Sequence, residues 1–551
     1  MGIRGLATSI CNRSNYCHPF QLKDTSLVID GTNLVFNLHR KANLHCIFGG
    51  EYPKYAAVVE NFFRILREVH VEPILIFDGQ LHKSLAQSAA MPYRKRKLDR
   101  TMSLFHGLTR EEDEEFASLF LEDILKRVAN RENVEMHQAY GDLNPLVVSM
   151  ANDLKCPILS RNSDFFILQV EFGFIYFESL ILPPLNDEKY ERNLSSYLNC
   201  SIFYFDDYHQ KELSQIDLDV LPVFGVLFGK NFLSCERLDD LIAGLICDEY
   251  RKGKHQSRPS AISDHLTPRL VKALEFFKNK NRRRIIDQIT AAMFDGEHRK
   301  GKNVPFCGKC GDIMATKAGF VDFIHEACHF YETRTGKEWQ RDVELSAKFS
   351  APDWCLEAHE KLSFPPHLMQ LIQSNKIVLW VVVEDFSSPS VFDCCLWLRL
   401  IVYKCCMNRR AVKFVKVFTI TEFSRDSNGE TSGKQIAIDR KDLYQWPFLD
   451  DFCRSSSRHN ICWIYRVVNI GQSTIDYLKN APFHLRGFLL SLKLWHQFTT
   501  KPKEKCLYAI IICSYGLLSK NCSSKWWRQS KFCVEDDREC RKVVGGKCLK
   551  L

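Results

Sequence analysis

Two short apolar runs, Leu27-Val-Ile-Asp30-Gly31 and Ile74-Leu-Ile-Phe-Asp78-Gly79, decide the fold. Both are rich in residues that favour strands, and both end in an aspartate followed by a glycine. We expect each run to be a strand of a parallel sheet with helices on both faces. Because residues at the carboxyl ends of such strands line the crevice where ligands bind, Asp30 and Asp78 are predicted to lie close together.

Two further aspartates extend this pattern. Asp164 follows the apolar run Pro157-Ile-Leu-Ser160, and Asp142 precedes a segment predicted to be helical. Carboxylates that meet in one crevice repel one another unless a divalent cation neutralises them. The four aspartates therefore predict a metal-dependent site for phosphodiester chemistry. The alternative for each of them is a turn or helix-capping role, which Asp-Gly pairs favour.

The first 235 residues read as alternating strands and helices, which is typical of an α/β fold. Strands are expected at residues 26–30, 72–78, 134–139 and 157–160, and helices at 55–70, 111–129, 144–154 and 218–229. An exposed basic linker is expected at 251–266, a helical stretch at 278–293 and a loop at 424–434. We therefore predict an α/β domain at residues 1–250, a basic linker with a helical extension at 251–300, and a mainly helical accessory region at 301–551.

The order of these motifs resembles that of a known family. The N-terminal Met1-Gly-Ile-Arg-Gly-Leu6, the two Asp-Gly strands, and the later segments around Asp142 and Asp164 together resemble the N-terminal half of flap endonuclease-type nucleases. Val226-Leu-Phe-Gly229-Lys-Asn231 resembles the apolar-Gly-x-Asp ending of that half. Within this superfamily the chain resembles the asteroid subfamily, because a basic linker stands where a Gly-x-Gly hairpin would follow Asn231. The resemblance implies a PIN-like fold in which about seven acids bind Mg²⁺ or Mn²⁺ as a pair of ions.

Three amides stand at positions where the resemblance implies acids: Asn144, Asn162 and Asn231. Each keeps an oxygen ligand but removes one unit of negative charge. Two divalent ions about 4 Å apart repel by roughly 16 kcal/mol at an effective dielectric constant of about 20, so they need surrounding anions. We therefore expect one weakly held Mg²⁺ or Mn²⁺ rather than a pair. The first cation position would be formed by Asp30, Asp78, Asp142 and Asn144, and the second by Asn162, Asp164 and Asn231.

A basic stretch, Tyr93-Arg-Lys-Arg-Lys97 with Arg100, lies between the second and third acidic motifs. In flap endonucleases the corresponding region, here about residues 85–130, is a helical arch that orders a single strand. The resemblance implies that Lys95, Arg96 and Arg100 contact phosphates and that Tyr93 stacks on a base. The alternatives are a nuclear import signal and a solvated helix face.

Two other motifs are weaker. Cys307, Cys310, His325, Cys328 and His329 have spacing that zinc ligands can adopt, but the surrounding phenylalanines favour ordinary core, so zinc is not expected. The segment Gly429-Glu-Thr-Ser-Gly433-Lys434 resembles a phosphate loop, yet it has three residues between its glycines and lacks the final Ser/Thr. We interpret it as a surface loop.

The whole chain has 551 residues and a net charge of +9, with 12 Lys/Arg against 5 Asp/Glu in residues 501–551. Such basic clusters favour nucleic-acid partners and predict a nuclear location, to which a cytoplasmic one can be added. No apolar run is long enough for a membrane span, so no membrane partner is expected. The 23 cysteines are scattered, which indicates reduced thiols inside the cell.

Two functional hypotheses follow. The first is a divalent-metal-dependent, structure-specific DNA nuclease that acts on branched or single-stranded ends despite a depleted acidic site. The second is a catalytically weak or inactive pseudonuclease that serves as a nucleic-acid-binding scaffold or signalling adaptor. The four aspartates favour the first hypothesis, and the three amides favour the second.

Overall fold

The computed structural model describes residues 2–3, 5–11, 16–45, 50–79, 97–103, 119–185, 196–229, 274, 276–294, 316–329, 331–332, 351–382, 390–394, 396–409, 415–426, 431–444, 446, 448–454, 471–480 and 489–490. The chain divides into two compact units, residues 1–455 and 456–551. In the second unit the described elements include α21 (Gln472–Asn480). The boundaries predicted near residues 250 and 300 lie outside the described residues and stay predictions.

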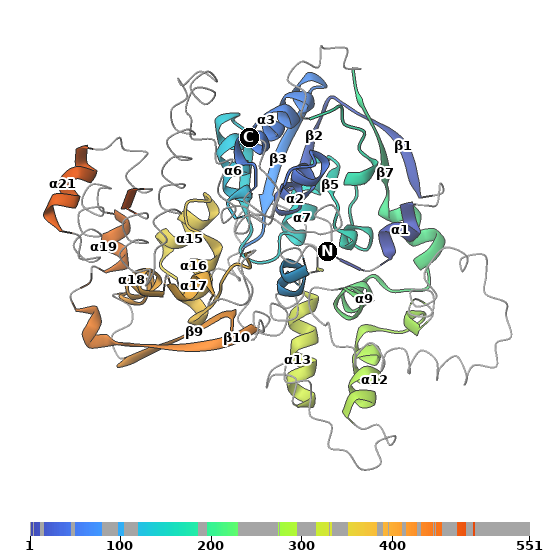
Figure 1. The fold of residues 1–551 in the computed structure, drawn as a ribbon. Helices are drawn as coiled ribbons and strands as arrows, with labels where there is room; N and C mark the ends of the chain where they lie inside the picture. Colours follow the sequence, from blue (N-terminus) through green and yellow to red (C-terminus); the bar gives the residue numbers. More distant parts are fainter. Residues whose placement is uncertain are drawn as a thin grey trace. The chain divides into compact units, whose positions relative to one another are not determined.

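A seven-stranded sheet forms the centre of the first part of the chain (Figure 1). Its strands are β1 (Cys17–Leu22), β2 (Thr25–Asp30), β3 (Val71–Phe77), β4 (Glu135–Gln138), β5 (Ile158–Ser160), β6 (Phe174–Tyr176) and β7 (Leu198–Phe203). They lie in the order β1-β7-β6-β5-β2-β3-β4. The five strands from β6 to β4 are parallel, which confirms the predicted α/β fold. β7 and β1 are antiparallel additions, so the complete sheet is mixed.

Helices cover both faces of this sheet because alternate residues of each strand point to opposite sides. In β2, Leu27 and Ile29 belong to one apolar core and Val28 belongs to the other. The first face is covered by α2 (Gly31–Lys41), α3 (Tyr52–Glu68) and α6 (Leu121–Arg131). The second face is covered by α1 (Leu6–Cys11), α7 (Asn144–Leu154), α8 (Phe205–Tyr208) and α9 (Leu221–Phe228). α13 (Lys317–Cys328) packs on α9, and α12 (Arg282–Phe294) packs on α13.

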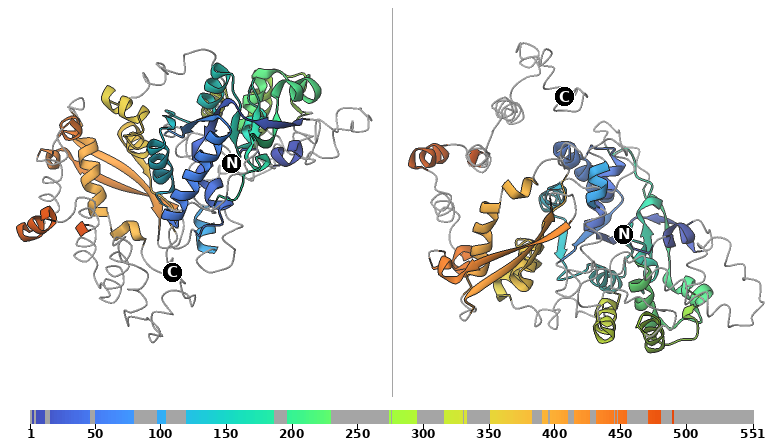
Figure 2. Two further views of the ribbon diagram at one scale, coloured as in Figure 1. Left: turned by 90° about the horizontal axis from the view of Figure 1, so that it is seen from above. Right: turned by 60° about the horizontal axis from the view of Figure 1, so that its bottom comes forward.

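Residues 351–454 form a smaller module with an apolar core of its own, which we call the accessory module. Its helices are α15 (Asp353–Glu360), α16 (Pro366–Ser374), α17 (Val391–Cys394), α18 (Leu396–Met407) and α19 (Leu449–Arg454). The mainly helical character predicted for this region is confirmed, and a three-stranded sheet accompanies the helices. That sheet has the order β10-β9-β8, from β8 (Lys376–Val378), β9 (Val417–Arg425) and β10 (Thr431–Asp439), and α18 packs beside it (Figure 2).

The predicted loop at residues 424–434 is wrong in part. β9 continues to Arg425 and β10 begins at Thr431, so Gly433 and Lys434 belong to a strand of a hairpin. Gly433 pairs with Phe423 and lies against its ring, where a Cβ atom would approach to 3.0 Å. Glycine is therefore used here for close packing between strands rather than for a phosphate loop.

Candidate active site

Asp30 is the last residue of β2 and at the same time the N-cap of α2. Its Oδ1 accepts a hydrogen bond from the backbone N of Asn33 at 2.8 Å, and its Oδ2 accepts one from Ser160 Oγ at 2.7 Å. Ser160 ends β5, so this carboxylate joins two neighbouring parallel strands. The side chain is 4% exposed, and burial raises its pKa to about 6 although both hydrogen bonds lower it. Asp30 is thus both a structural cap, as the alternative reading proposed, and a member of the acidic group.

Asp78 follows β3, and hydrogen bonds hold both its backbone and its side chain. Its backbone N donates to Thr32 Oγ1 at 3.0 Å, and its Oδ1 accepts from the backbone N of Leu143 at 3.1 Å. The side chain is half-buried. Burial first, and then the charges of Asp142 and Asp30, raise its pKa well above the usual value. Asp78 thus bonds to the residue that follows Asp142, and Asp30 ends the strand that pairs with β3, so these three predicted residues lie in one region of the site.

Asp142 and Asp164 complete the acidic group. Asp142 is half-buried and its Oδ1 accepts from the backbone N of Asn144 at 2.8 Å. Burial, followed by the charges of Asp164 and Asp30, raises the pKa of Asp142 to about 7. Asp164 is fully buried, and burial raises its pKa to about 6. The charge of Asp142 therefore interacts with those of the other three aspartates, and Asp78 and Asp142 are the partly exposed members of the group.

Two of the predicted amides contact each other directly. Asn162 Nδ2 donates to Asn144 Oδ1 at 3.2 Å, and both side chains are at most 5% exposed. Asn162 Oδ1 in turn accepts from the backbone N of Asp164 at 3.3 Å. Two carboxylates at these positions would repel each other, whereas two amides form a hydrogen bond without a cation. The third amide, Asn231, lies outside the described residues.

The two predicted cation positions differ in how well they suit a metal. Asp30, Asp78 and Asp142 supply carboxylate oxygens of the kind that Mg²⁺ and Mn²⁺ prefer. Within the described part of the chain, no three His, Cys, Asp or Glu side chains lie close enough to hold a metal ion as they stand. A cation at this first position therefore requires the carboxylates to move closer together than they lie in this structure. That rearrangement costs free energy and favours weak binding.

The second position does not suit a divalent cation. Its one described acid, Asp164, is enclosed and contacts Tyr331, whose hydroxyl lies 3.3 Å from Asp164 Oδ2 and 3.1 Å from the carbonyl oxygen of Gly225. The Tyr331 ring fills the space beside Gly225, where a Cβ atom would come within 2.6 Å of it. The neighbouring Asn162 donates to another amide. The Tyr331 hydroxyl and the Asn162 amide thus occupy part of the surroundings of Asp164.

Three residues of this site were missed by the sequence analysis: Gly2, Tyr331 and His359. Gly2 has a φ of +91°, and a Cβ atom there would lie 2.5 Å from both Asn162 Oδ1 and Ser163 Oγ. A signal for Gly2 was present, because the motif Met1-Gly-Ile-Arg-Gly-Leu6 is one of those that resemble the nuclease family. Tyr331 contacts Asp164, and His359 contacts Ala139 in the loop before Asp142. Both lie far along the chain from these partners, and no local pattern points to them.

Most of the predicted DNA-contacting residues cannot be located. Tyr93, Lys95 and Arg96 lie outside the described residues, and Arg100 lies in the helical segment 97–103. In that segment Leu98 and Thr101 are buried, which anchors it to the body of the protein. The Lys97 ammonium lies 5.8 Å from the centre of the Phe36 ring on α2. The segment is therefore placed beside the helix that begins at Asp30.

The candidate zinc ligands are only partly described. Cys307 and Cys310 lie outside the described residues. Cys328 is fully buried, and burial raises the pKa of its thiol to about 12. His329 Nδ1 lies 2.7 Å from a carboxylate oxygen of Glu332. These surroundings are those of a core thiol and a surface ion pair.

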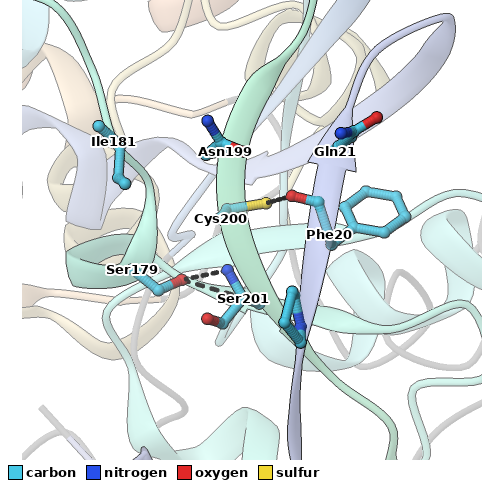
Figure 3. Close-up of a pocket in the computed structure, with 8 residues that line it drawn as sticks. Phe20, Gln21, Ser179, Ile181, Asn199, Cys200 and Ser201 are labelled. Atoms are coloured by element: carbon cyan, nitrogen blue, oxygen red, sulfur yellow. Dashed lines mark hydrogen bonds between the residues drawn. The ribbon is translucent and has the colours of Figure 1, made fainter.

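A shallow hollow of about 420 Å³ lies at the β1–β7 edge of the sheet (Figure 3). Neutral side chains line it, among them Phe20, Asn199 and the largely exposed Ile181. Cys200 Sγ lies 3.6 Å from the carbonyl oxygen of Phe20, and Ser179 Oγ donates to the carbonyl oxygen of Ser201 at 3.1 Å. These contacts connect strands and loops, and the acidic group at the ends of β2, β3 and β5 is not part of the lining.

The sequence of this chain is similar to those of known proteins. A family model described as the XPG N-terminal domain matches residues 1–100. The Mus musculus protein named Single-strand DNA endonuclease ASTE1 is 25% identical over 421 residues, which cover 74% of this chain and 56% of that protein. The Drosophila melanogaster protein named Protein asteroid is 22% identical over 348 residues, which cover 53% of this chain and 40% of that protein.

The chain thus spans about half the length of the curated relatives it matches. Among solved structures, human GEN1 in complex with Holliday junction DNA is similar with a TM-score of 0.29 and 13% sequence identity. That match covers 81% of this chain and 94% of the GEN1 chain. Among the described residues, no helix has both the length and the apolar character that crossing a membrane requires.

Proposed function

Because this chain belongs to the asteroid subfamily of flap endonuclease-type proteins, we propose that it is a divalent-metal-dependent DNA nuclease with a depleted acidic site. Its substrate in this proposal is DNA with branched or single-stranded ends, and its cation is one weakly bound Mg²⁺ or Mn²⁺. The observation that carries the proposal is the position of Asp30 and Asp78 at the carboxyl ends of the neighbouring parallel strands β2 and β3, with Asp78 bonded to the backbone N of Leu143 beside Asp142. A nuclear location, which the basic clusters predict, belongs to the same proposal.

The residues of the acidic group have different tasks in this proposal. When bound, the cation would neutralise phosphate charge and lower the pKa of a water molecule. The half-buried Asp78 and Asp142 face the side from which a phosphate can approach, and the buried Asp30 holds the ends of β2 and β5 together. Arg100, with Tyr93, Lys95 and Arg96, would orient a single strand towards these carboxylates.

The second candidate function is a pseudonuclease that binds DNA and does not cut it. The specific observation in its favour is the hydrogen bond between Asn162 and Asn144, supported by the contact of Tyr331 with Asp164. In both contacts, polar groups that could coordinate a pair of cations are instead bonded to other protein groups. In this case the protein would act as a scaffold or signalling adaptor on nucleic acid.

Cleavage of 5′-flap and 3′-flap DNA by the full chain, with Mg²⁺, Mn²⁺ or EDTA, separates the two candidates. We expect slow cation-dependent cleavage by the wild type and a loss of about 100-fold or more in Asp78→Asn. The matched control is Asp153→Asn, which makes the same chemical change on an exposed position of α7. Equal cleavage by wild type and Asp78→Asn would reject the nuclease. DNA binding without cleavage by any variant would establish the pseudonuclease.

A further inference from the structure

The accessory module contacts the loop that carries Asp142. His359, at the end of α15, is fully buried, and its Nε2 lies 3.0 Å from the carbonyl oxygen of Ala139. The next residue, Glu360, accepts a hydrogen bond from the Tyr140 hydroxyl. The rings of Tyr140 and His359 are 5.8 Å apart with an interplanar angle of 32°. α15 therefore holds residues 139 and 140 through three separate contacts.

This loop is also fastened to the end of β3. The backbone N of Ala139 donates to the carbonyl oxygen of Phe77 at 2.9 Å, and the backbone N of Gly79 donates to that of Gly141 at 2.7 Å. A Cβ atom on Gly79 would come within 2.0 Å of the Ala139 carbonyl oxygen, so the two segments approach as closely as backbones can. The Ala139 carbonyl oxygen is thus enclosed between β3 and His359.

The accessory module packs both within itself and against the nuclease half. It has its own apolar core, which includes Cys355 and Met369. Between α15 and α16, Leu362 packs instead against the core formed by α2, α3 and α6. The module therefore rests on the nuclease half, and one of its contacts, between His359 and Ala139, lies three residues before Asp142.

We propose that α15 is a positioning element of the acidic site, in which His359 and Glu360 hold the loop 139–142 so that the Asp142 carboxylate lies beside Asp78. The effect on cation binding rests on the proposed function, whereas the effect on the loop does not. His359 is a positioning residue here, because it touches the loop and none of the four aspartates. The accessory module thereby contributes to the geometry of the acidic site.

The geometry of His359 supplies a matched pair of variants. Its Nδ1 lies 3.3 Å from the Phe364 carbonyl oxygen, within the module, and its Nε2 faces Ala139 across the contact. A glutamine amide nitrogen can take the place of Nε2, and an asparagine amide nitrogen can take the place of Nδ1. His359→Gln therefore keeps a donor for the loop, and His359→Asn keeps only the contact within the module.

Hydrogen exchange of the metal-free full chain tests the positioning directly. We expect amides at 139–144 to exchange about threefold to tenfold faster in His359→Asn, as the loss of one buried hydrogen bond implies, and near the wild-type rate in His359→Gln. Peptides from β1 and β7 serve as the internal reference. Wild-type exchange at 139–144 in His359→Asn would overturn the proposal. If α15 itself loses protection in that variant, Tyr140→Phe decides, because it deletes only the hydroxyl bonded to Glu360. Faster exchange at 141–143 in Tyr140→Phe supports the proposal, and unchanged exchange rejects it.

Mn²⁺ titration by calorimetry tests the consequence for the site. We expect the Mn²⁺ dissociation constant to rise by about threefold to tenfold in His359→Asn and to stay near the wild-type value in His359→Gln. Altered exchange together with an unchanged dissociation constant would reject the link from α15 to the cation. If the wild type binds no Mn²⁺ while His359→Asn still shows faster exchange at 139–144, the proposed metal site is refuted and the positioning of the loop is retained.

Discussion

Restoring one acid, Asn162→Asp, should make the stability of this protein depend on pH and on divalent cations. Asn162 is 5% exposed and donates to Asn144 Oδ1 at 3.2 Å. An ionised carboxylate at position 162 has no proton to donate to Asn144 Oδ1. It also adds a negative charge beside those of Asp142 and Asp164. A protonated carboxyl can still donate to Asn144. The cost of the substitution therefore depends on ionisation.

The neighbouring Asp164 sets the scale of that cost. It is fully buried, and burial raises its pKa from 3.8 to about 6. A shift of about two units corresponds to about 3 kcal/mol of penalty for holding the charge. An acid whose pKa is raised on folding loses its stabilising contribution as pH rises through the folded-state pKa. We thus expect Asn162→Asp to cost about 1 kcal/mol near pH 4 and about 3 kcal/mol near pH 8, with the change falling between these values.

Urea unfolding in EDTA at both pH values measures this difference. Asn152→Asp is the matched control, because Asn152 lies on α7 with its side chain bonded to a surface carbonyl. We expect the control to change stability by less than about 1 kcal/mol at either pH. Millimolar Mn²⁺ at pH 8 should recover part of the loss in Asn162→Asp and none in the control. An equal loss at both pH values, or equal recovery in the control, would refute the charge argument.

Two further predictions concern the accessory module. Glu422→Gln should lower the free energy of unfolding by about 3 kcal/mol, measured by urea unfolding, because Arg399 makes two hydrogen bonds to this almost fully buried carboxylate, at 2.7 and 2.9 Å. For His359, burial lowers the pKa below 6.5, with Lys126 lowering it further and Glu360 raising it. As pH falls, His359 takes up a proton at a higher pH in the unfolded chain than in the folded protein, so the free energy of unfolding should fall below about pH 6.5. His359→Gln should remove that part of the dependence of stability on pH.

The strands that carry the acids could be predicted because their signals are local. Asp30 and Asp78 each end an apolar run, and a parallel sheet brings the ends of such runs to one edge. β1 was missed because its pattern is weak: it contains Pro19, which suits the edge position it occupies. β7 alternates buried and exposed residues from Leu198 onward, so the signal for that strand was present and overlooked.

The contacts around the acids could not be predicted because they join distant residues. The hydroxyl of Tyr331 meets Asp164, which lies 167 positions earlier, and His359 meets Ala139, which lies 220 positions earlier. The sequence showed that the amides lack charge, but it held no sign that Asn162 bonds to another amide. Pairings of this kind are decided by the packing of whole elements, which no short motif records.

The distribution of acids and amides fits a site that must remain folded without a metal. Every carboxylate in an enclosed group destabilises the metal-free protein, as the raised pKa values of Asp30 and Asp164 indicate. The amides Asn144 and Asn162 stand in the enclosed part, where they bond to each other without a cation. Burial and neighbouring carboxylates raise the pKa of the half-buried Asp78 and Asp142 as well, and a cation that arrived there would relieve that cost. Hydrogen-bonded amides thus stabilise the interior of the site without a metal, and the partly exposed carboxylates stand where a cation could reach them.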